Sequence, residues 1–174
     1  MDDDGKMRGL VCDDEALARM RLKRLVEMAN MEVSAEAASG REAVESAGRL
    51  RPDVVLMDIR MPDMDGLEAA AHLDKMENPP AVIFCTAYEE HALQAFRVHA
   101  VDYLLKPVGG QDLKRALDKA RALNRMQIAE LSHKMAANQT GRRRHLSART
   151  HRGLELVPVE EVRDFQAGQK YVGV

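Results

Sequence analysis

The strongest constraint on the fold is an alternation between short apolar runs and longer amphipathic segments, repeated five times. The runs are Met7–Cys12, Val33–Ala38, Val54–Met57, Ala81–Cys85 and Val101–Leu105. The third run has no polar residue, which is typical of a strand covered on both faces of a parallel sheet. The alternation therefore predicts an α/β fold with a doubly wound parallel sheet and right-handed crossovers.

The segments between the runs show helical spacing of apolar residues or helix-start signals. An apolar stripe extends from Ala18 to Ala29, and further helices are predicted over 89–98 and from Leu113 onward, continuing through Met135. Two capping-box patterns, Ser39 with Glu42 and Asp65 with Glu68, predict the starts of the second and third helices.

The composition allows a core of aliphatic side chains. The chain of 174 residues is 45% hydrophobic but only 3% aromatic, and its net charge of -2 does not by itself indicate a nucleic-acid or membrane partner. No apolar run approaches the length of a membrane-spanning helix, and the acidic N-terminus does not resemble a signal peptide. We expect a soluble, cytoplasmic protein with no membrane partner.

Polar side chains gather at the predicted carboxyl ends of the strands. Asp13 and Asp14 follow the first run, Asp58 the third, Thr86 the fourth and Lys106 the fifth. The ligand crevice of an open α/β sheet lies at this edge, so we expect these side chains to converge.

This set of groups predicts phosphoryl-transfer chemistry. Three neighbouring carboxylates repel one another and favour a cation, and an all-oxygen site with few protein ligands favours Mg²⁺, with Mn²⁺ as the alternative. An ammonium and a hydroxyl beside such an ion can bind phosphoryl oxygens. Asp58 is the predicted nucleophile, and an acyl phosphate is the predicted product.

Residues 7–124 resemble the receiver domain of two-component response regulators. The resemblance rests on Asp13-Asp14, Asp58, Pro62, Gly66, Thr86-Ala87, Tyr103 and Lys106-Pro107, in the family's order and spacing. It implies a flavodoxin-like fold with five parallel strands in the order 2-1-3-4-5. It also implies a sensor histidine kinase as the partner that phosphorylates Asp58 in an Mg²⁺-dependent reaction.

The resemblance further implies a set of metal ligands. Asp14 would bind Mg²⁺ directly and Asp13 through a water molecule. Asp58 and the backbone carbonyl of Arg60 would complete the protein ligands.

Other residues would bind the phosphoryl group or report on it. Thr86, Lys106 and the backbone of Ala87 would contact phosphoryl oxygens, and Pro107 would follow a cis peptide bond. Thr86 and Tyr103 would form the switch, although a plain core position is the alternative for Tyr103. Phosphorylation would then reshape the face of helix 4, strand 5 and helix 5, through which the family forms homodimers.

The sequence changes character after the receiver-like part. Residues 125–142 are expected to form an extended helix and linker, and residues 131–154 contain no acidic side chain. Residues 143–174 resemble the start of a LytTR-type (LytR/AlgR) DNA-binding domain, on the motifs Leu154–Val162 and Gly168–Val172. This resemblance implies a partial all-β segment, here an incomplete output domain, and DNA as the partner of the complete protein.

Two terminal segments carry weaker patterns. Residues 1–6 are acidic and are expected to form a disordered tail. Arg142, Arg143 and Arg144 are either solvated linker residues or contacts to DNA phosphates, and both interpretations remain open.

Two other functions are alternatives to a phosphorylation-controlled transcription regulator. One is a receiver that acts only through protein contacts. The other is a phosphatase of the haloacid-dehalogenase type, which carries a second Asp two residues after its nucleophile. Here Arg60 occupies that position, and the acidic pair comes first in the chain rather than last. We therefore expect a phosphoacceptor with at most slow autodephosphorylation and no enzyme activity beyond that.

Overall fold

The computed structural model describes residues 5–139, 145–150 and 153–158. It divides into two compact units, residues 1–125 and 126–174. Strands and helices alternate in the order β1 (Arg8–Cys12), α1 (Ala16–Met28), β2 (Glu32–Ala37), α2 (Gly40–Leu50), β3 (Val54–Met57), α3 (Gly66–Asp74), β4 (Ala81–Thr86), α4 (Ala92–Arg97), β5 (Asp102–Leu105) and α5 (Gly110–Gln139).

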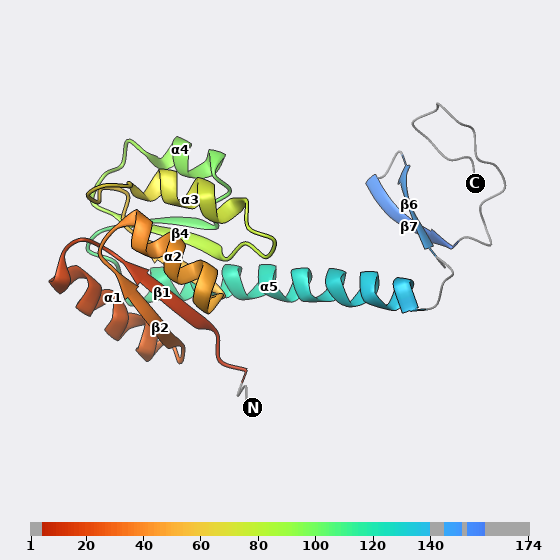
Figure 1. Ribbon diagram of the computed structural model, residues 1–174, viewed down its shortest axis with the longest axis horizontal. Coiled ribbons are helices and arrows are strands. Elements are labelled where there is room, and N and C mark those ends of the chain that lie inside the picture. Colours follow the sequence, from red (N-terminus) through yellow and green to blue (C-terminus); the bar gives the residue numbers. More distant parts are fainter. Residues whose placement is uncertain (1–4, 140–144, 151–152, 159–174) are drawn as a thin grey trace. The chain divides into compact units, whose positions relative to one another are not determined.

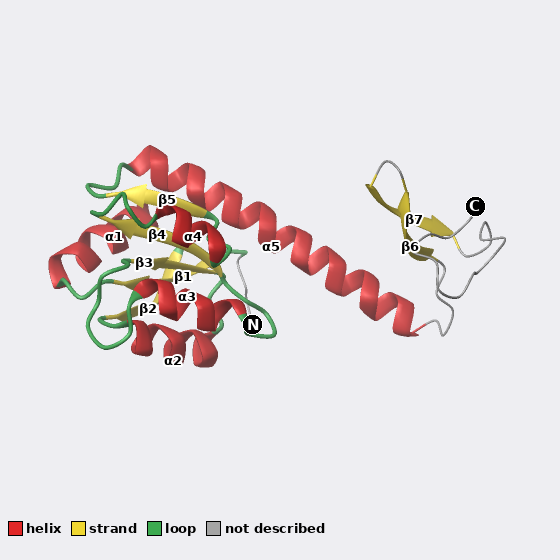
Figure 2. Ribbon diagram, turned by 90° about the horizontal axis from the view of Figure 1, so that it is seen from above, coloured by secondary structure: helices red, strands yellow, loops and turns green. Residues whose placement is uncertain are grey.

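The five strands form one parallel sheet in the order β2-β1-β3-β4-β5, which confirms the predicted fold and strand order (Figure 2). β3 lies at its centre, where Met57 pairs with Cys12 on one side and with Phe84 on the other. All four residues of β3 are fully buried, as expected of a strand with helices on both faces.

Alternate residues of β3 belong to two separate cores. Val54 and Leu56 pack with side chains of α1 and α5. Val55 and Met57 pack with side chains of α2, α3 and α4 on the opposite face. The period of two along the strand thus divides the helices into two layers, which Figure 1 shows around the sheet.

Both predicted capping boxes start helices. The side chain of Ser39 accepts a hydrogen bond from the Glu42 N–H at 3.2 Å, and Asp65 accepts one from the Glu68 N–H at 2.8 Å. By contrast, α4 has only six residues, and the side chain of its first flanking residue, His91, does not cap it. The prediction of a helix over 89–98 was too long because 89–91 form turns that lack a capping side chain.

The C-terminal unit contains the end of α5 and an antiparallel pair of strands, β6 (His145–Thr150) and β7 (Gly153–Pro158). These two strands agree with the all-β segment expected over residues 143–174. Residues 159–174 of that segment, the three consecutive arginines and most of the N-terminal tail lie outside the described residues. Within the described ranges, every helix is too short or too polar to cross a membrane.

Candidate functional site

The backbone places four polar residues side by side at the carboxyl edge of the sheet. The N–H of Asp13 donates to the Ala37 carbonyl at 3.0 Å, and the N–H of Asp58 donates to the Cys12 carbonyl at 2.9 Å. The N–H of Lys106 donates to the carbonyl of Thr86 at 2.8 Å. These bonds continue the strand ladders one step beyond β1, β3 and β5, so the side chains emerge at neighbouring positions.

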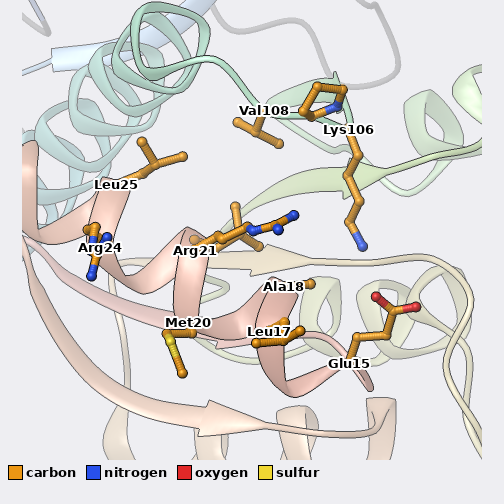
Figure 3. A pocket seen from close by; sticks show the side chains of 11 residues that line it. Glu15, Leu17, Ala18, Met20, Arg21, Arg24, Leu25, Lys106 and Val108 are labelled. Carbon is orange, nitrogen blue, oxygen red and sulfur yellow. The ribbon is translucent and has the colours of Figure 1, made fainter.

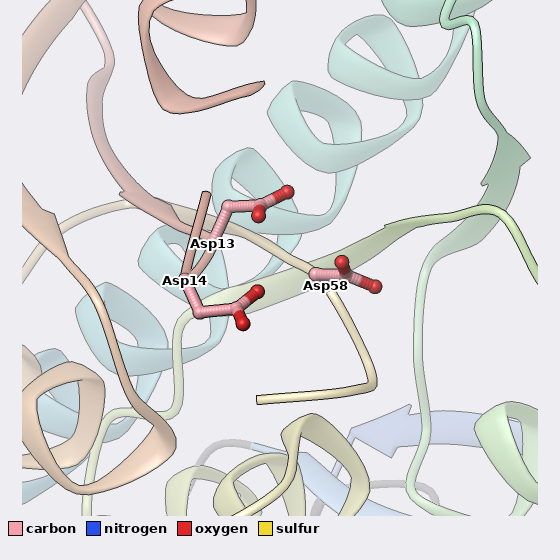
Figure 4. A group of neighbouring side chains, drawn as sticks. All are labelled: Asp13, Asp14 and Asp58. Atoms are coloured by element: carbon pink, nitrogen blue, oxygen red, sulfur yellow. The ribbon is translucent and has the colours of Figure 1, made fainter. Parts of the chain in front are cut away.

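Three carboxylates converge at this edge. Asp13, Asp14 and Asp58 each offer an oxygen, and these oxygens lie within 4.8 Å of one another (Figure 4). Asp13 is fully buried and Asp58 is 6% exposed, whereas Asp14 faces solvent. The exposed member gives the cluster access to solution.

Lys106 joins the two buried carboxylates. Its Nζ donates to Asp13 Oδ2 at 2.6 Å and to Asp58 Oδ2 at 2.9 Å. The remaining oxygens accept backbone hydrogen bonds, Asp13 Oδ1 from the Glu15 N–H at 2.9 Å and Asp58 Oδ1 from the Ile59 N–H at 2.7 Å. Both carboxylates are therefore fixed in orientation before any ligand binds.

The charges of the cluster are not balanced. Burial raises the pKa of the Asp13 carboxyl, and the hydrogen bond from Lys106 only partly opposes this effect. Burial acts to lower the pKa of Lys106, but its hydrogen bonds to Asp13 and Asp58 outweigh burial and leave the pKa raised. One ammonium faces three carboxylates, so a divalent cation would complete the neutralisation.

Thr86 ends β4 beside this cluster and is fully buried. Its Oγ1 has no hydrogen-bond partner within the described part of the chain. Buried hydroxyls without a partner are rare in folded proteins because losing water without a replacement costs free energy. The hydroxyl is therefore available to a ligand at the strand edge.

The loop between β3 and α3 folds tightly onto the backbone of Asp58. The N–H of Gly66 donates to the carbonyl of Ile59 at 2.7 Å. A Cβ at position 66 would lie 2.1 Å from the backbone oxygen of Asp58, so only glycine fits there. The far side of the loop rests on α2, where a Cβ at Gly40 would lie 2.4 Å from the carbonyl oxygen of Met64.

A second group of side chains borders the site over the β4–α4 loop. The guanidinium of Arg60 stacks on the ring of Tyr88, with Cζ 3.7 Å from the ring centroid, and contacts Glu90 at 3.4 Å. The hydroxyl of Tyr103 donates to the backbone carbonyl of Tyr88, and its half-buried ring lies 6.3 Å from that of Phe84. The expected switch residue is thus bonded to the loop that follows Thr86.

A groove of about 590 Å³ opens between α1 and the β5–α5 connection (Figure 3). Its lining combines apolar residues such as Leu17 and Met20 with four charged side chains, those of Glu15, Arg21, Arg24 and Lys106. Lys106 belongs to both the groove and the acidic site, so the two are adjacent.

The structure places the predicted site residues as follows. Asp13, Asp14, Asp58 and Lys106 form one cluster, Thr86 ends the adjacent strand, and Ala87 follows it in an exposed position. The Lys106–Pro107 peptide bond is cis. The three arginines proposed as DNA contacts lie outside the described residues.

Sequence reasoning missed two residues that support this site. Gly40 lies inside the capping box of Ser39 and Glu42 and was given no role at the site, although a glycine directly after a capping serine was the available signal for a close approach. Arg19 was given no role either, yet it contacts the backbone of the acidic pair. A basic residue one turn into the helix after two acids was the available signal.

Known proteins resemble this chain in sequence. The family described as response regulator receiver domain matches residues 10–118. The chain is 52% identical over 168 residues to the positive alginate biosynthesis regulatory protein of Pseudomonas aeruginosa, covering 95% of this chain and 68% of that protein. It is 38% identical to the sensory transduction protein LytT of Bacillus anthracis, covering 90% of this chain and 64% of LytT.

Solved receiver structures agree with this match. The receiver domain of AraT, a response regulator from Geobacillus stearothermophilus, has a TM-score of 0.62 at 36% identity, covering 70% of this chain and 98% of that domain. The response regulator domain of Thermotoga maritima CheB has a TM-score of 0.59 at 38% identity, covering 67% of this chain and 95% of the domain. The chain belongs to the response regulator receiver family, and its relatives are regulators of the LytTR (LytR/AlgR) type.

Proposed function

We propose that this chain is a phosphorylation-controlled switch in which Asp58 accepts a phosphoryl group from a sensor histidine kinase. One carboxylate oxygen of Asp58 attacks the phosphorus, and the P–N bond of the phosphohistidine breaks. The imidazole nitrogen leaves with the electron pair and takes up a proton. The observation that carries the proposal is the hydrogen bond from Lys106 to Asp58 at 2.9 Å, beside the Thr86 hydroxyl, which has no partner among the residues that the structure describes.

The same residues fit a divalent cation. Asp13, Asp14 and Asp58 supply oxygen donors only, a set that suits Mg²⁺ or Mn²⁺ rather than Zn²⁺. The backbone carbonyl of Arg60 is the proposed fourth protein ligand. A bound ion would supply neutralisation of phosphoryl charge, while Lys106 and Thr86 of this chain bind phosphoryl oxygens together with the backbone of Ala87.

The output of the switch is proposed to lie on α4, β5 and α5. An occupied phosphate site would draw the hydroxyl of Thr86 toward it and change the space beside Tyr103. Leu93 and Phe96 of α4 are each 82% exposed, and Leu105 of β5 is 41% exposed. Apolar side chains so exposed on a short helix fit a surface that pairs with a second copy of the chain after phosphorylation.

The kinase is proposed to approach through the groove between α1 and the β5–α5 connection. Because Lys106 lines both the groove and the acidic site, a partner in the groove can place a phosphohistidine near Asp58. Three cationic side chains against the single carboxylate of Glu15 give the apolar lining a positive balance, which suits a helix that carries apolar and acidic residues.

Residues 125–142 are proposed to connect the receiver domain to a DNA-binding output, with 143–174 as the start of a LytTR-type domain. The chain spans about two thirds of the length of its relatives, 68% of one and 64% of the other. We propose that the complete protein controls transcription and acts in the cytoplasm. Arg142, Arg143 and Arg144 are proposed to contact DNA phosphates.

The test is acyl-phosphate formation measured by intact mass spectrometry after treatment with acetyl phosphate, with and without Mg²⁺. The wild-type chain should gain one phosphoryl group only with Mg²⁺, and Asp58→Asn should gain none. Asp53→Asn is the matched control, because Asp53 lies at the opposite end of β3 and accepts a hydrogen bond from the Arg8 N–H. Retained labelling of Asp58→Asn would contradict the proposal.

A further inference from the structure

Arg19 lies on α1 beside the loop that carries the acidic pair. Its Nη1 donates to the backbone carbonyl of Asp13 at 2.6 Å and approaches that of Asp14 at 3.3 Å. Its side chain is only 19% exposed, in contrast to 43% for Lys23 one turn later. Arg19 thus differs from its basic neighbour by packing against the site.

Glu36 of β2 holds the guanidinium from the other side. Arg19 Nε lies 3.6 Å from Glu36 Oε2, while Lys23 Nζ contacts Glu36 Oε1 at 3.0 Å. The planar fork of an arginine can face a carboxylate and two carbonyls at once, which a lysine ammonium does less well. Arg19 therefore ties together α1, β2 and the β1–α1 loop.

These contacts hold the acidic loop by its backbone and leave the carboxylates for other partners. With both carbonyls bonded to Arg19, the peptide planes after Asp13 and Asp14 are fixed. The carboxylate of Asp13 then remains directed at Lys106 and the Glu15 N–H. A loop ordered in advance loses less conformational entropy when it takes up an ion.

We propose that Arg19 is a positioning residue that prearranges Asp13 and Asp14 for a divalent cation, with Glu36 orienting its guanidinium. The inference rests on the proposed function of the acidic cluster as a metal site. Groups that orient metal ligands typically contribute about 10- to 100-fold to metal affinity. Arg19→Ala should accordingly weaken Mg²⁺ binding about tenfold.

Charge and positioning predict opposite outcomes for this variant. Removal of a cation near three carboxylates, taken alone, would strengthen the binding of Mg²⁺ because it removes a repulsion. Weaker binding by Arg19→Ala can therefore not come from its charge. Lys23→Ala is the matched control, since Lys23 shares Glu36 with Arg19, while the contacts to the Asp13 and Asp14 carbonyls come from Arg19.

The experiment titrates Mg²⁺ into the full chain and follows amide resonances by NMR, together with amide hydrogen exchange of the metal-free chain. Arg19→Ala should weaken binding and speed exchange at the Glu15 N–H, which bonds to Asp13. Lys23→Ala should leave binding unchanged or slightly stronger. Arg19→Lys keeps the positive charge but not the planar guanidinium, so its Mg²⁺ affinity should lie between those of the other two variants. It serves as the test if Arg19→Ala does not fold.

Unchanged Mg²⁺ affinity in a folded Arg19 variant would overturn the inference, as would equal weakening by Lys23→Ala. A wild-type chain that binds no Mg²⁺ would instead overturn the proposed metal site. In that case exchange at the Glu15 N–H still decides whether Arg19 holds the loop, so the two failures remain distinct.

Discussion

The two halves of the site differ in how completely their polar atoms are bonded. At the ends of β1 and β3, both oxygens of Asp13 and of Asp58 accept hydrogen bonds. At the end of β4, Thr86 Oγ1 has no partner within the described residues. The first half is assembled before a ligand arrives, whereas the second retains bonding capacity that a ligand could use.

The helices beside the two halves show the same difference. α3, which follows β3, begins with a side-chain cap from Asp65. α4, which follows β4, has six residues, lacks a side-chain cap and exposes Leu93 and Phe96. A short uncapped helix is marginal without tertiary contacts, so this half is the one that can rearrange at low cost. The ends of β1 and β3 are thus built for ligand binding, whereas the end of β4 and the helix α4 are suited to the conformational response.

The largest expected effect comes from disturbing the half of the site at the ends of β1 and β3. In Gly66→Ala the added Cβ would meet the backbone of Asp58 at 2.1 Å, and the loop must move. We expect a loss of about 3 kcal/mol in the free energy of unfolding. Urea denaturation measures this loss.

Gly48→Ala is the control for the same substitution, because a Cβ there meets nothing within 4 Å and the residue is exposed within α2. It should stabilise the chain by about 1 kcal/mol through the higher helix propensity of alanine. Equal stabilities of the two variants would show that the tight approach of the loop to Asp58 is absent.

The next largest effect is expected at the end of β4, where the Thr86 hydroxyl lies. Thr86→Val keeps the shape of the side chain but removes a buried hydroxyl that has no partner in the described part of the chain. We expect the free energy of unfolding to rise by about 2 kcal/mol, because the variant avoids the cost of burying a hydroxyl group without a hydrogen bond. Phosphorylation by acetyl phosphate should slow at the same time. A destabilised variant would mean that the hydroxyl is already satisfied in the folded chain.

The strand ends of the site could be predicted from sequence, whereas contacts between separate elements could not. The strand ends followed from apolar runs and turn residues, and the strand order from the resemblance to receiver domains, so Asp13, Asp58 and Lys106 were placed at one edge correctly. Contacts between separate elements, such as that of Arg19 with two backbone carbonyls, leave only a weak signal in the sequence, here a basic residue one turn after an acidic pair. The length of α4 was also missed, because the absence of a cap matters more there than apolar spacing.

A smaller effect is expected from removing the buried negative charge of Asp13. Asp13→Asn replaces a buried carboxylate whose pKa is raised by burial. Without Mg²⁺ the variant should be more stable at neutral pH by about 1 kcal/mol, as is common when a functional charge is removed. Thermal denaturation should also show that Mg²⁺ no longer stabilises the variant. Asp14→Asn, at an exposed position, should change the metal-free stability by less than about 0.5 kcal/mol.

The difference in stability between Asp13→Asn and wild type should depend on pH. Because the pKa of Asp13 is higher in the folded than in the unfolded chain, the folded state binds the proton more tightly. The contribution of Asp13 to stability is thus fully present below its unfolded pKa and is lost as pH rises through the folded pKa. The difference in stability between Asp13→Asn and wild type should therefore shrink as pH falls. A difference that is constant with pH would contradict the raised pKa.

The smallest expected effect lies where the two halves meet. Arg60, from the loop after β3, stacks on Tyr88 from the loop after β4 and contacts exposed Glu90. Cation–π contacts at exposed sites contribute about 0.5–1 kcal/mol, which corresponds to a change of about threefold in a rate. If the stacked pair limits the access of water to the acyl phosphate, Arg60→Ala should shorten its lifetime by about that factor, measured by phosphate release.

Two further variants separate the stack from the charge of Arg60. Tyr88→Leu removes the aromatic face but keeps an apolar side chain, and it should shorten the lifetime as much as Arg60→Ala does. Glu90→Gln removes only the ion-pair partner, whose side chain is 59% exposed, and it should change the lifetime little. If Glu90→Gln had the larger effect, the ion pair of Arg60 with Glu90, rather than the stack of Arg60 on Tyr88, would control the access of water to the acyl phosphate.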